Sequence, residues 1–150
     1  MRGEELLPTR AAETARVTTA ASARAHVRGL VDAGWDAVTR PAAERDLIDL
    51  LLVVSELVAN AVRHGGGLAG FEATPGRDGV RLSVHDHSDV VPEAAYGPGA
   101  LPVGHHGSGY GWPLILRLAR EVSIRPRPSG GKTITVFVPI RTEAPWPTDP

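Results

Sequence analysis

The stretch that decides the fold runs from residue 50 to residue 67 and reads LLLVVSELVANAVRHGGG. Its apolar run predicts a buried helix, and the glycines that follow predict its end. Glu56 and Asn60 interrupt the run four residues apart, so on a helix they share a face, with His64 one turn further along. Burying a carboxylate and an amide without partners costs roughly 2 kcal/mol or more. The face is therefore predicted to line a cavity that holds a polar ligand.

The composition indicates one globular domain of 150 residues, 42% hydrophobic and 22% charged. The 16 Lys and Arg nearly balance the 17 Asp and Glu, so no general attraction to nucleic acid or to an anionic membrane is expected. The absence of cysteine excludes disulfides, thiolate metal ligands and a cysteine nucleophile. No apolar run approaches ~20 residues, so neither a signal peptide nor a membrane span is expected. Together these features predict a cytoplasmic protein.

The hydrophobic period changes from helical to alternating after the glycines. Helices are expected at about 11–33, 41–64 and 112–119, and strands at 68–74, 80–86, 121–127 and 133–140. Residues 1–10 lack a clear period and could hold a short edge strand. Residues 141–150 contain three prolines and are expected to form a loose tail. The domain itself is therefore expected to span residues 11–140.

Asp86 is a second acid that the pattern directs inward. Val80, Leu82 and Val84 alternate with polar residues, and Asp86 continues their phase toward the helices. Residues 87–107 then show no regular period and contain several prolines and glycines. A structureless loop of this length, about twenty residues, is more often a functional lid than a passive connector.

A glycine-rich turn leads from this loop into the helix expected at 112–119. Gly107, Gly109 and Gly111 would leave backbone N–H groups free at the positive end of that helix, as a polyphosphate requires. Alone this signal is weak, because glycine clusters before helices often only form turns. The ordered combination of the polar helix face, Asp86, the loop and this turn suggests one nucleotide pocket.

These motifs, in this order, resemble the GHKL ATPase superfamily, which contains histidine kinases and gyrase B subunits. Residues 55–65 resemble its N box, Asp86 falls at its G1-box aspartate, residues 109–112 at its G2-box glycines, and residues 131–134 at its last-strand Gly/Thr element. The resemblance is greatest to anti-sigma-factor serine kinases and related actinobacterial regulators. It implies a Bergerat-type ATP-binding fold of the α/β class: an α+β two-layer sandwich with a mixed, mostly antiparallel sheet covered on one face by about three helices.

The resemblance also implies a role for each motif residue. Asn60 would ligate Mg²⁺ through its side-chain oxygen, and Glu56 would be the general base toward a serine or threonine hydroxyl. Asp86 would accept a hydrogen bond from the adenine amino group of ATP, and Thr133 would support the adenine end. The residues whose backbone would approach the phosphates are Gly107, Gly109, Tyr110 and Gly111.

The function that the resemblance implies is an ATP-dependent serine/threonine protein kinase. It would phosphorylate an anti-sigma-factor antagonist, bind a sigma factor and form a homodimer, without direct contact to nucleic acid or membrane. A non-catalytic ATP-binding regulatory module of the same fold is the alternative. Ser88 favours that alternative, because the family's G1 box usually has glycine there. Trp112 is a second departure, standing where a smaller aliphatic residue is common.

Four histidines suggest a rival prediction of another class. His85, His87, His105 and His106 could form a zinc site, since imidazoles are common zinc ligands. His85 has the phase of the solvent-facing side of its strand, and the other reading is that these histidines are simply exposed.

Overall fold

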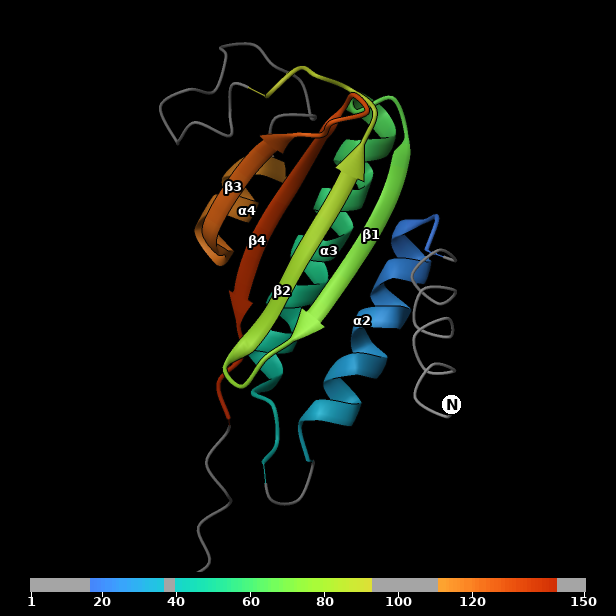
Figure 1. Ribbon diagram of the computed structural model, residues 1–150. Helices are drawn as coiled ribbons and strands as arrows, with labels where there is room; N and C mark the ends of the chain where they lie inside the picture. The colour runs from blue at the N-terminus through green and yellow to red at the C-terminus, as the bar shows by residue number, and fades with distance from the viewer. Residues whose placement is uncertain (1–16, 37–39, 93–110, 143–150) are drawn as a thin grey trace, which may run out of the picture.

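The computed structural model describes residues 17–36, 40–92 and 111–142. These residues form three helices and a four-stranded sheet (Figure 1). The helices are α2 (Ala20–Gly34), α3 (Glu44–His64) and α4 (Gly111–Leu118). The strands are β1 (Leu68–Pro75), β2 (Gly79–Asp86), β3 (Arg120–Pro126) and β4 (Lys132–Pro139). None of the helices in the described ranges is long and apolar enough to cross a membrane.

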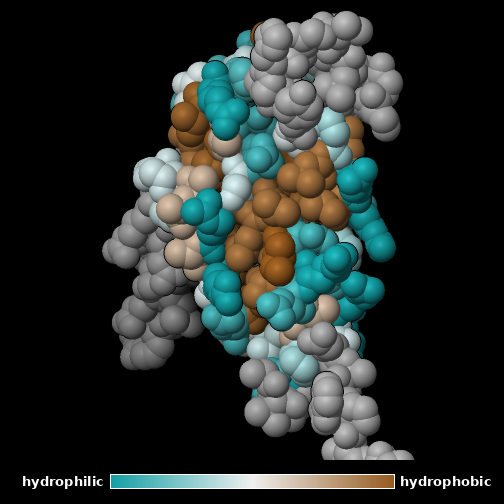
Figure 2. All heavy atoms as spheres, turned by 180° about the vertical axis from the view of Figure 1, so that it is seen from behind, coloured by the Kyte–Doolittle hydropathy of each residue, from teal (hydrophilic) through white to brown (hydrophobic). Residues whose placement is uncertain are grey.

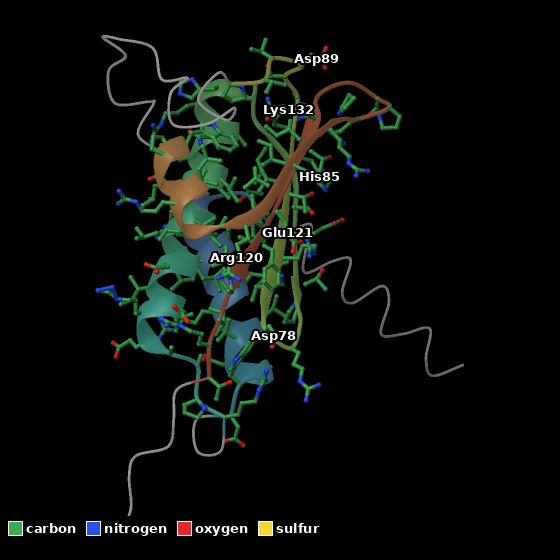
Figure 3. The ribbon with its side chains drawn as sticks, turned by 90° about the vertical axis from the view of Figure 1, so that its left-hand side faces the viewer. Asp78, His85, Asp89, Arg120, Glu121 and Lys132 are labelled. Atoms are coloured by element: carbon green, nitrogen blue, oxygen red, sulfur yellow. The ribbon has the colours of Figure 1, made fainter. Side chains whose placement is uncertain are left out.

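The sheet and the helices form two layers. The strand order is β1-β2-β4-β3, and every neighbouring pair is antiparallel. Figures 1 and 3 show the helices together on one side of the sheet. The predicted α+β sandwich is thus confirmed. The prediction was a mixed, mostly antiparallel sheet, and the described strand pairs are all antiparallel.

Helix α3 supplies the centre of the core because its apolar side chains follow a helical period. Glu44 and Asp46 lie in its first turn and Arg63 and His64 in its last, where each charge opposes the nearer end of the helix dipole. The buried apolar side chains of α3 are Leu50, Val53, Val54, Leu57, Val58 and Ala61. These side chains pack against alternate residues of the sheet, so α3 fixes how the helical layer sits on the strands.

The helices α2 and α3 start later than the sequence predicts. Helix α2 begins at Ala20 because Thr19 is extended and forms a reciprocal cap with Ser22, in which each backbone N–H donates to the other side chain. Helix α3 begins at Glu44, after residues 41–43, which the sequence placed in the helix. The Ala43 N–H donates instead to a carbonyl near the end of the domain, at Arg141.

Residues Arg141 and Thr142 are held to the fold, although they belong to the segment expected to be loose. Thr142 forms a β-bridge with Ala42, and the Arg141 guanidinium and N–H both bind Asp46. The remainder of that segment, and the edge strand expected in residues 1–10, lie outside the described residues.

Strand β4 alternates strictly between the two faces of the sheet. Its helix-facing residues are all buried: Lys132, Ile134, Val136 and Val138. The intervening residues face the open side, where the Thr133 and Thr135 hydroxyls bond His85 and Ser83 of β2 and where Arg81 stacks on Phe137. The position of a residue in this alternation therefore determines whether its side chain faces the helices or the open side of the sheet.

Candidate functional site

Asp86, the last residue of β2, is buried on the helix-facing side, as the alternation predicted; only 2% of its surface is exposed. Its Oδ2 accepts from Lys132 Nζ at 2.9 Å, and its Oδ1 accepts from the Ser88 backbone N–H at 3.0 Å. Lys132 is equally buried, with 4% of its surface exposed. Two opposite charges are thus removed from water together, which requires that each remain paired.

The turn between β3 and β4 fixes the position of Lys132. The Gly131 N–H donates to Asp89 Oδ1 at 2.8 Å, and Lys132 Nζ donates a second hydrogen bond, to the Ser88 carbonyl, at 3.2 Å. Gly131 has a φ of 84°, and a Cβ there would collide with the Asp86 carbonyl oxygen. Figure 3 shows Lys132 and Asp89 at the same end of the sheet. We call Asp86, Ser88, Asp89, Gly131 and Lys132 the Asp86 end of the site.

The Asp86 end lies against the C-terminal end of α3. The His87 N–H donates to the Gly65 carbonyl at 2.8 Å, and a Cβ on Gly65 would fall 2.6 Å from Asp86 Oδ2. At a rise of 1.5 Å per residue, Asn60 and Glu56 lie about 7.5 and 13.5 Å back along the helix from Gly65. The polar face of α3 therefore leads away from Asp86, as one elongated ligand would require.

Glu56, Asn60 and Gly111 form a second polar group, which we call the Asn60 end. Asn60 is buried, with 8% of its surface exposed, and its Nδ2 has no hydrogen-bond partner in the described structure. Gly111 begins α4, and a Cβ there would collide with the Glu56 carboxylate and lie 3.5 Å from Asn60 Nδ2. The start of α4 thus faces the polar face of α3. Within the described residues, Glu56 has neither a hydrogen bond nor an ion pair.

One predicted site residue lies on the other face of the sheet. Thr133, expected to support the adenine end, faces the open side of the sheet, where its hydroxyl lies 2.7 Å from His85 Nδ1. Lys132 is the β4 residue beside Asp86, and it is not among the residues predicted for the site. The sequence did contain the information, because Lys132 continues the alternation of the helix-facing residues Ile134 and Val136. The residues of the predicted phosphate turn that lie outside the described structure are Gly107, Gly109 and Tyr110.

Ser88 is accommodated without backbone strain. Among the described residues other than glycine, only Glu121 has a positive φ. The Ser88 hydroxyl accepts from the Val90 N–H at 3.1 Å, so the side chain stabilises the loop. The Ser88 backbone N–H occupies one Asp86 oxygen, and Lys132 occupies the other.

The rival histidine site finds no support in the described part of the chain. No group of three or more His, Cys, Asp or Glu side chains suited to a metal ion occurs there. His85 is engaged with Thr133, and its Nε2 lies 3.9 Å from a Glu72 carboxylate oxygen. His105 and His106 lie outside the described residues.

The Asn60 end fits Mg²⁺ and phosphate. A buried amide without a partner is unusual, and Asn60 can turn its oxygen to a hard cation, which prefers oxygen ligands. The N–H groups that open α4 can donate to phosphate oxygens. At the Asp86 end the acceptor for a base amino group is present, but Lys132 and Ser88 already hold both of its oxygens.

Comparisons with known proteins show the family of the chain. A family model described as a histidine kinase-like ATPase domain matches residues 6–137. The sensor-type histidine kinase PrrB of Mycobacterium tuberculosis (strain ATCC 25618 / H37Rv) is 31% identical over 102 residues, which cover 60% of this chain and 23% of that protein. PrrB of Mycobacterium leprae (strain TN) is 32% identical over 101 residues, covering 59% of this chain and 22% of that protein. The match thus spans less than a quarter of the length of these relatives. Because the family model covers most of the sequence, the chain belongs to the histidine kinase-like ATPase domain family, within the GHKL superfamily.

Proposed function

We propose that the protein is an ATP-dependent serine/threonine protein kinase of the anti-sigma type. It would transfer the terminal phosphoryl group of Mg²⁺–ATP to an anti-sigma-factor antagonist and regulate transcription through a sigma factor. The observation that carries the proposal is the Asn60 end, where Glu56 and the unpaired Asn60 amide face the start of α4. ATP binding follows from the family, whereas the transfer and its acceptor are the proposal.

Each residue of the Asn60 end has a separate role in the proposed transfer. When bound, Mg²⁺–ATP supplies the phosphoryl group and the cation that offsets its charge. The Asn60 side-chain oxygen would hold the metal, and the Gly111 N–H would donate to a phosphate oxygen. The Glu56 carboxylate takes the proton from the attacking hydroxyl. Glu56 suits this task because it has no competing partner within the described residues.

Protein partners would need an accessible surface, and the helical layer offers one. Ile48, Leu52 and Val62 of α3 are 53%, 41% and 54% exposed. Figure 2, seen from the helical side, shows apolar side chains gathered over this layer. Exposed apolar groups of this kind are typical of protein-binding surfaces. We expect a sigma factor, an antagonist or a second copy of the chain to cover them.

The second candidate is a nucleotide-binding regulatory module that transfers no phosphoryl group. The observation that favours it is the Lys132–Asp86 ion pair, because it engages the acceptor that the resemblance assigns to adenine. In this case nucleotide occupancy would change the partner surface, and Glu56 would have no catalytic role.

Transfer of labelled phosphate from ATP to candidate antagonist proteins separates the two functions. Wild type should label its antagonist, and Glu56→Gln should lower the rate by about 10²–10⁴-fold while binding Mg²⁺–ATP as wild type does. Asp49→Asn, a change to another acid of α3 outside the site, serves as the matched control and should keep the wild-type rate. Binding without transfer by wild type would leave the regulatory module. No binding of Mg²⁺–ATP would contradict both functions.

A further inference from the structure

The residue that faces Asp86, the acceptor that the resemblance assigns to the base, is Lys132, and the fold holds it there. Lys132 Nζ lies 2.9 Å from Asp86 Oδ2 and 3.2 Å from the Ser88 carbonyl oxygen. The turn that precedes Lys132 is tied to the loop after β2 by the bond from the Gly131 N–H to Asp89. Arg127 adds a further tie, since its Nη1 donates to the Asp86 carbonyl at 3.0 Å. The ion pair is therefore part of a closed network.

Because of this network, replacing the Lys132 ammonium at Asp86 with a neutral ligand group costs free energy. Lys132 and Asp86 are both almost fully buried, so a group that replaced the ammonium would leave a buried charge without its partner. A neutral amino group offers one hydrogen bond in return, which is worth less than the pair that it would disrupt. The amino group of adenine consequently has little to gain at Asp86 while Lys132 is present.

We propose that Lys132 determines base selectivity: its ammonium holds the Asp86 carboxylate in an ion pair, so the exocyclic amino group of adenine adds little to the binding of ATP. This inference rests on the proposed nucleotide site and concerns the selectivity of that site. The wild-type chain then binds purine nucleotides through their phosphates and metal, with weak discrimination at the base. Removal of Lys132 creates the discrimination that the wild type lacks.

The test compares ATP with purine ribonucleoside triphosphate, which lacks the amino group, each with Mg²⁺, by calorimetric titration. Wild type should bind the two with dissociation constants within about twofold of each other. Lys132→Met should bind ATP about tenfold more tightly than the analogue, the factor expected for one hydrogen bond to a carboxylate. Lys132→Arg keeps the positive charge and is the matched control. It should show the same ratio of the two dissociation constants as the wild type. Adding Asp86→Asn to Lys132→Met should return the ratio toward one.

Lys132→Thr is the second variant, because its hydroxyl can still donate to Asp86 if Lys132→Met fails to fold. Circular dichroism establishes that each variant is folded. The ratio of the two dissociation constants in the wild type can be measured even if no variant folds.

A wild type that already prefers ATP about tenfold would overturn the inference, as would folded Lys132→Met and Lys132→Thr proteins that keep the wild-type ratio. If the wild type and the variants all bind ATP and share the same ratio of the two dissociation constants, only the selectivity inference fails. If the wild type does not bind Mg²⁺–ATP, the proposed function fails together with the inference, whether or not the variants bind.

Discussion

The Asp86 end and the Asn60 end differ in how their buried polar atoms are paired. At the Asp86 end, both carboxylate oxygens and the Lys132 ammonium have partners. At the Asn60 end, a buried amide nitrogen lacks a partner and Glu56 has none among the described residues. Because folded proteins rarely leave buried polar groups unsatisfied, the contrast indicates that the first end is complete as part of the fold. We propose that a ligand completes the second end.

Removal of the Asp86 carboxylate should give the largest loss of stability. Asp86→Ala leaves the Lys132 ammonium buried without a counter-charge, so the free energy of unfolding should fall by about 3–5 kcal/mol in urea denaturation. Asp89→Ala is the matched control in the same loop. It removes one hydrogen bond from an exposed acid and should cost about 1 kcal/mol. Equal losses would show that the Asp86 end does not depend on its ion pair.

Gly131 and Gly130 provide a second contrast within one turn. Both have positive φ, of 84° and 101°, but only at Gly131 does a Cβ meet another part of the chain, the Asp86 carbonyl. Gly130→Ala should cost about 1 kcal/mol from backbone strain. Gly131→Ala should cost at least about 1 kcal/mol more, because the loop after β2 must shift. Urea denaturation of the two variants measures the difference, and identical midpoints would argue against a tight Asp86 end.

The ion pair of Asp46 and Arg141 is a reference outside both ends. Arg141 lowers the pKa of the Asp46 carboxyl from its usual 3.8, chiefly through side-chain hydrogen bonds. A lowered folded-state pKa means that the stabilisation is present above the unfolded value and is lost as the pH falls through the folded value. Asp46→Asn should therefore destabilise the protein at about pH 7 and much less at about pH 2. A pH-independent difference between the two unfolding curves would contradict this. Since Arg141 is largely exposed, the effect should be smaller than at Asp86.

Asn60→Ala should cost nothing in the absence of ligand. The substitution removes an unpaired buried amide and introduces a residue with a higher helix propensity, so stability should stay the same or rise by about 0.5 kcal/mol. Urea denaturation without nucleotide measures the change. A loss of more than about 1 kcal/mol would mean that Asn60 has a structural partner and that the two ends do not differ as described.

The parts of the fold that local sequence determines were predicted well. The period of α3, the glycines after it, the two strands that follow and the inward phase of Asp86 each depend on neighbouring residues. The starts of α2 and α3 were predicted too early. The start of α2 depends on the reciprocal cap at Thr19, and the start of α3 depends on pairing with residues nearly a hundred positions away.

The site was harder to predict because its contacts join distant segments. The approach of Gly111 to Asn60 and the pairing of Lys132 with Asp86 depend on tertiary packing and on the register of β2 with β4. The alternation of β4 did contain the position of Lys132. The Gly/Thr motif instead predicted a role for Thr133, which is the next residue along β4 and lies on the other face of the sheet.

The most direct test of the contrast is the thermal unfolding midpoint with and without Mg²⁺–ATP, for wild type and Asn60→Ala. A ligand that binds only the folded state raises the midpoint, and the rise grows with the logarithm of the ratio of its free concentration to its dissociation constant. Wild type should therefore show a rise with Mg²⁺–ATP that disappears when the metal is chelated. Asn60→Ala should unfold at or above the wild-type temperature without ligand and show little rise with it. A wild-type midpoint that Mg²⁺–ATP leaves unchanged, or an Asn60→Ala protein that is destabilised without ligand, would contradict a ligand-completed Asn60 end.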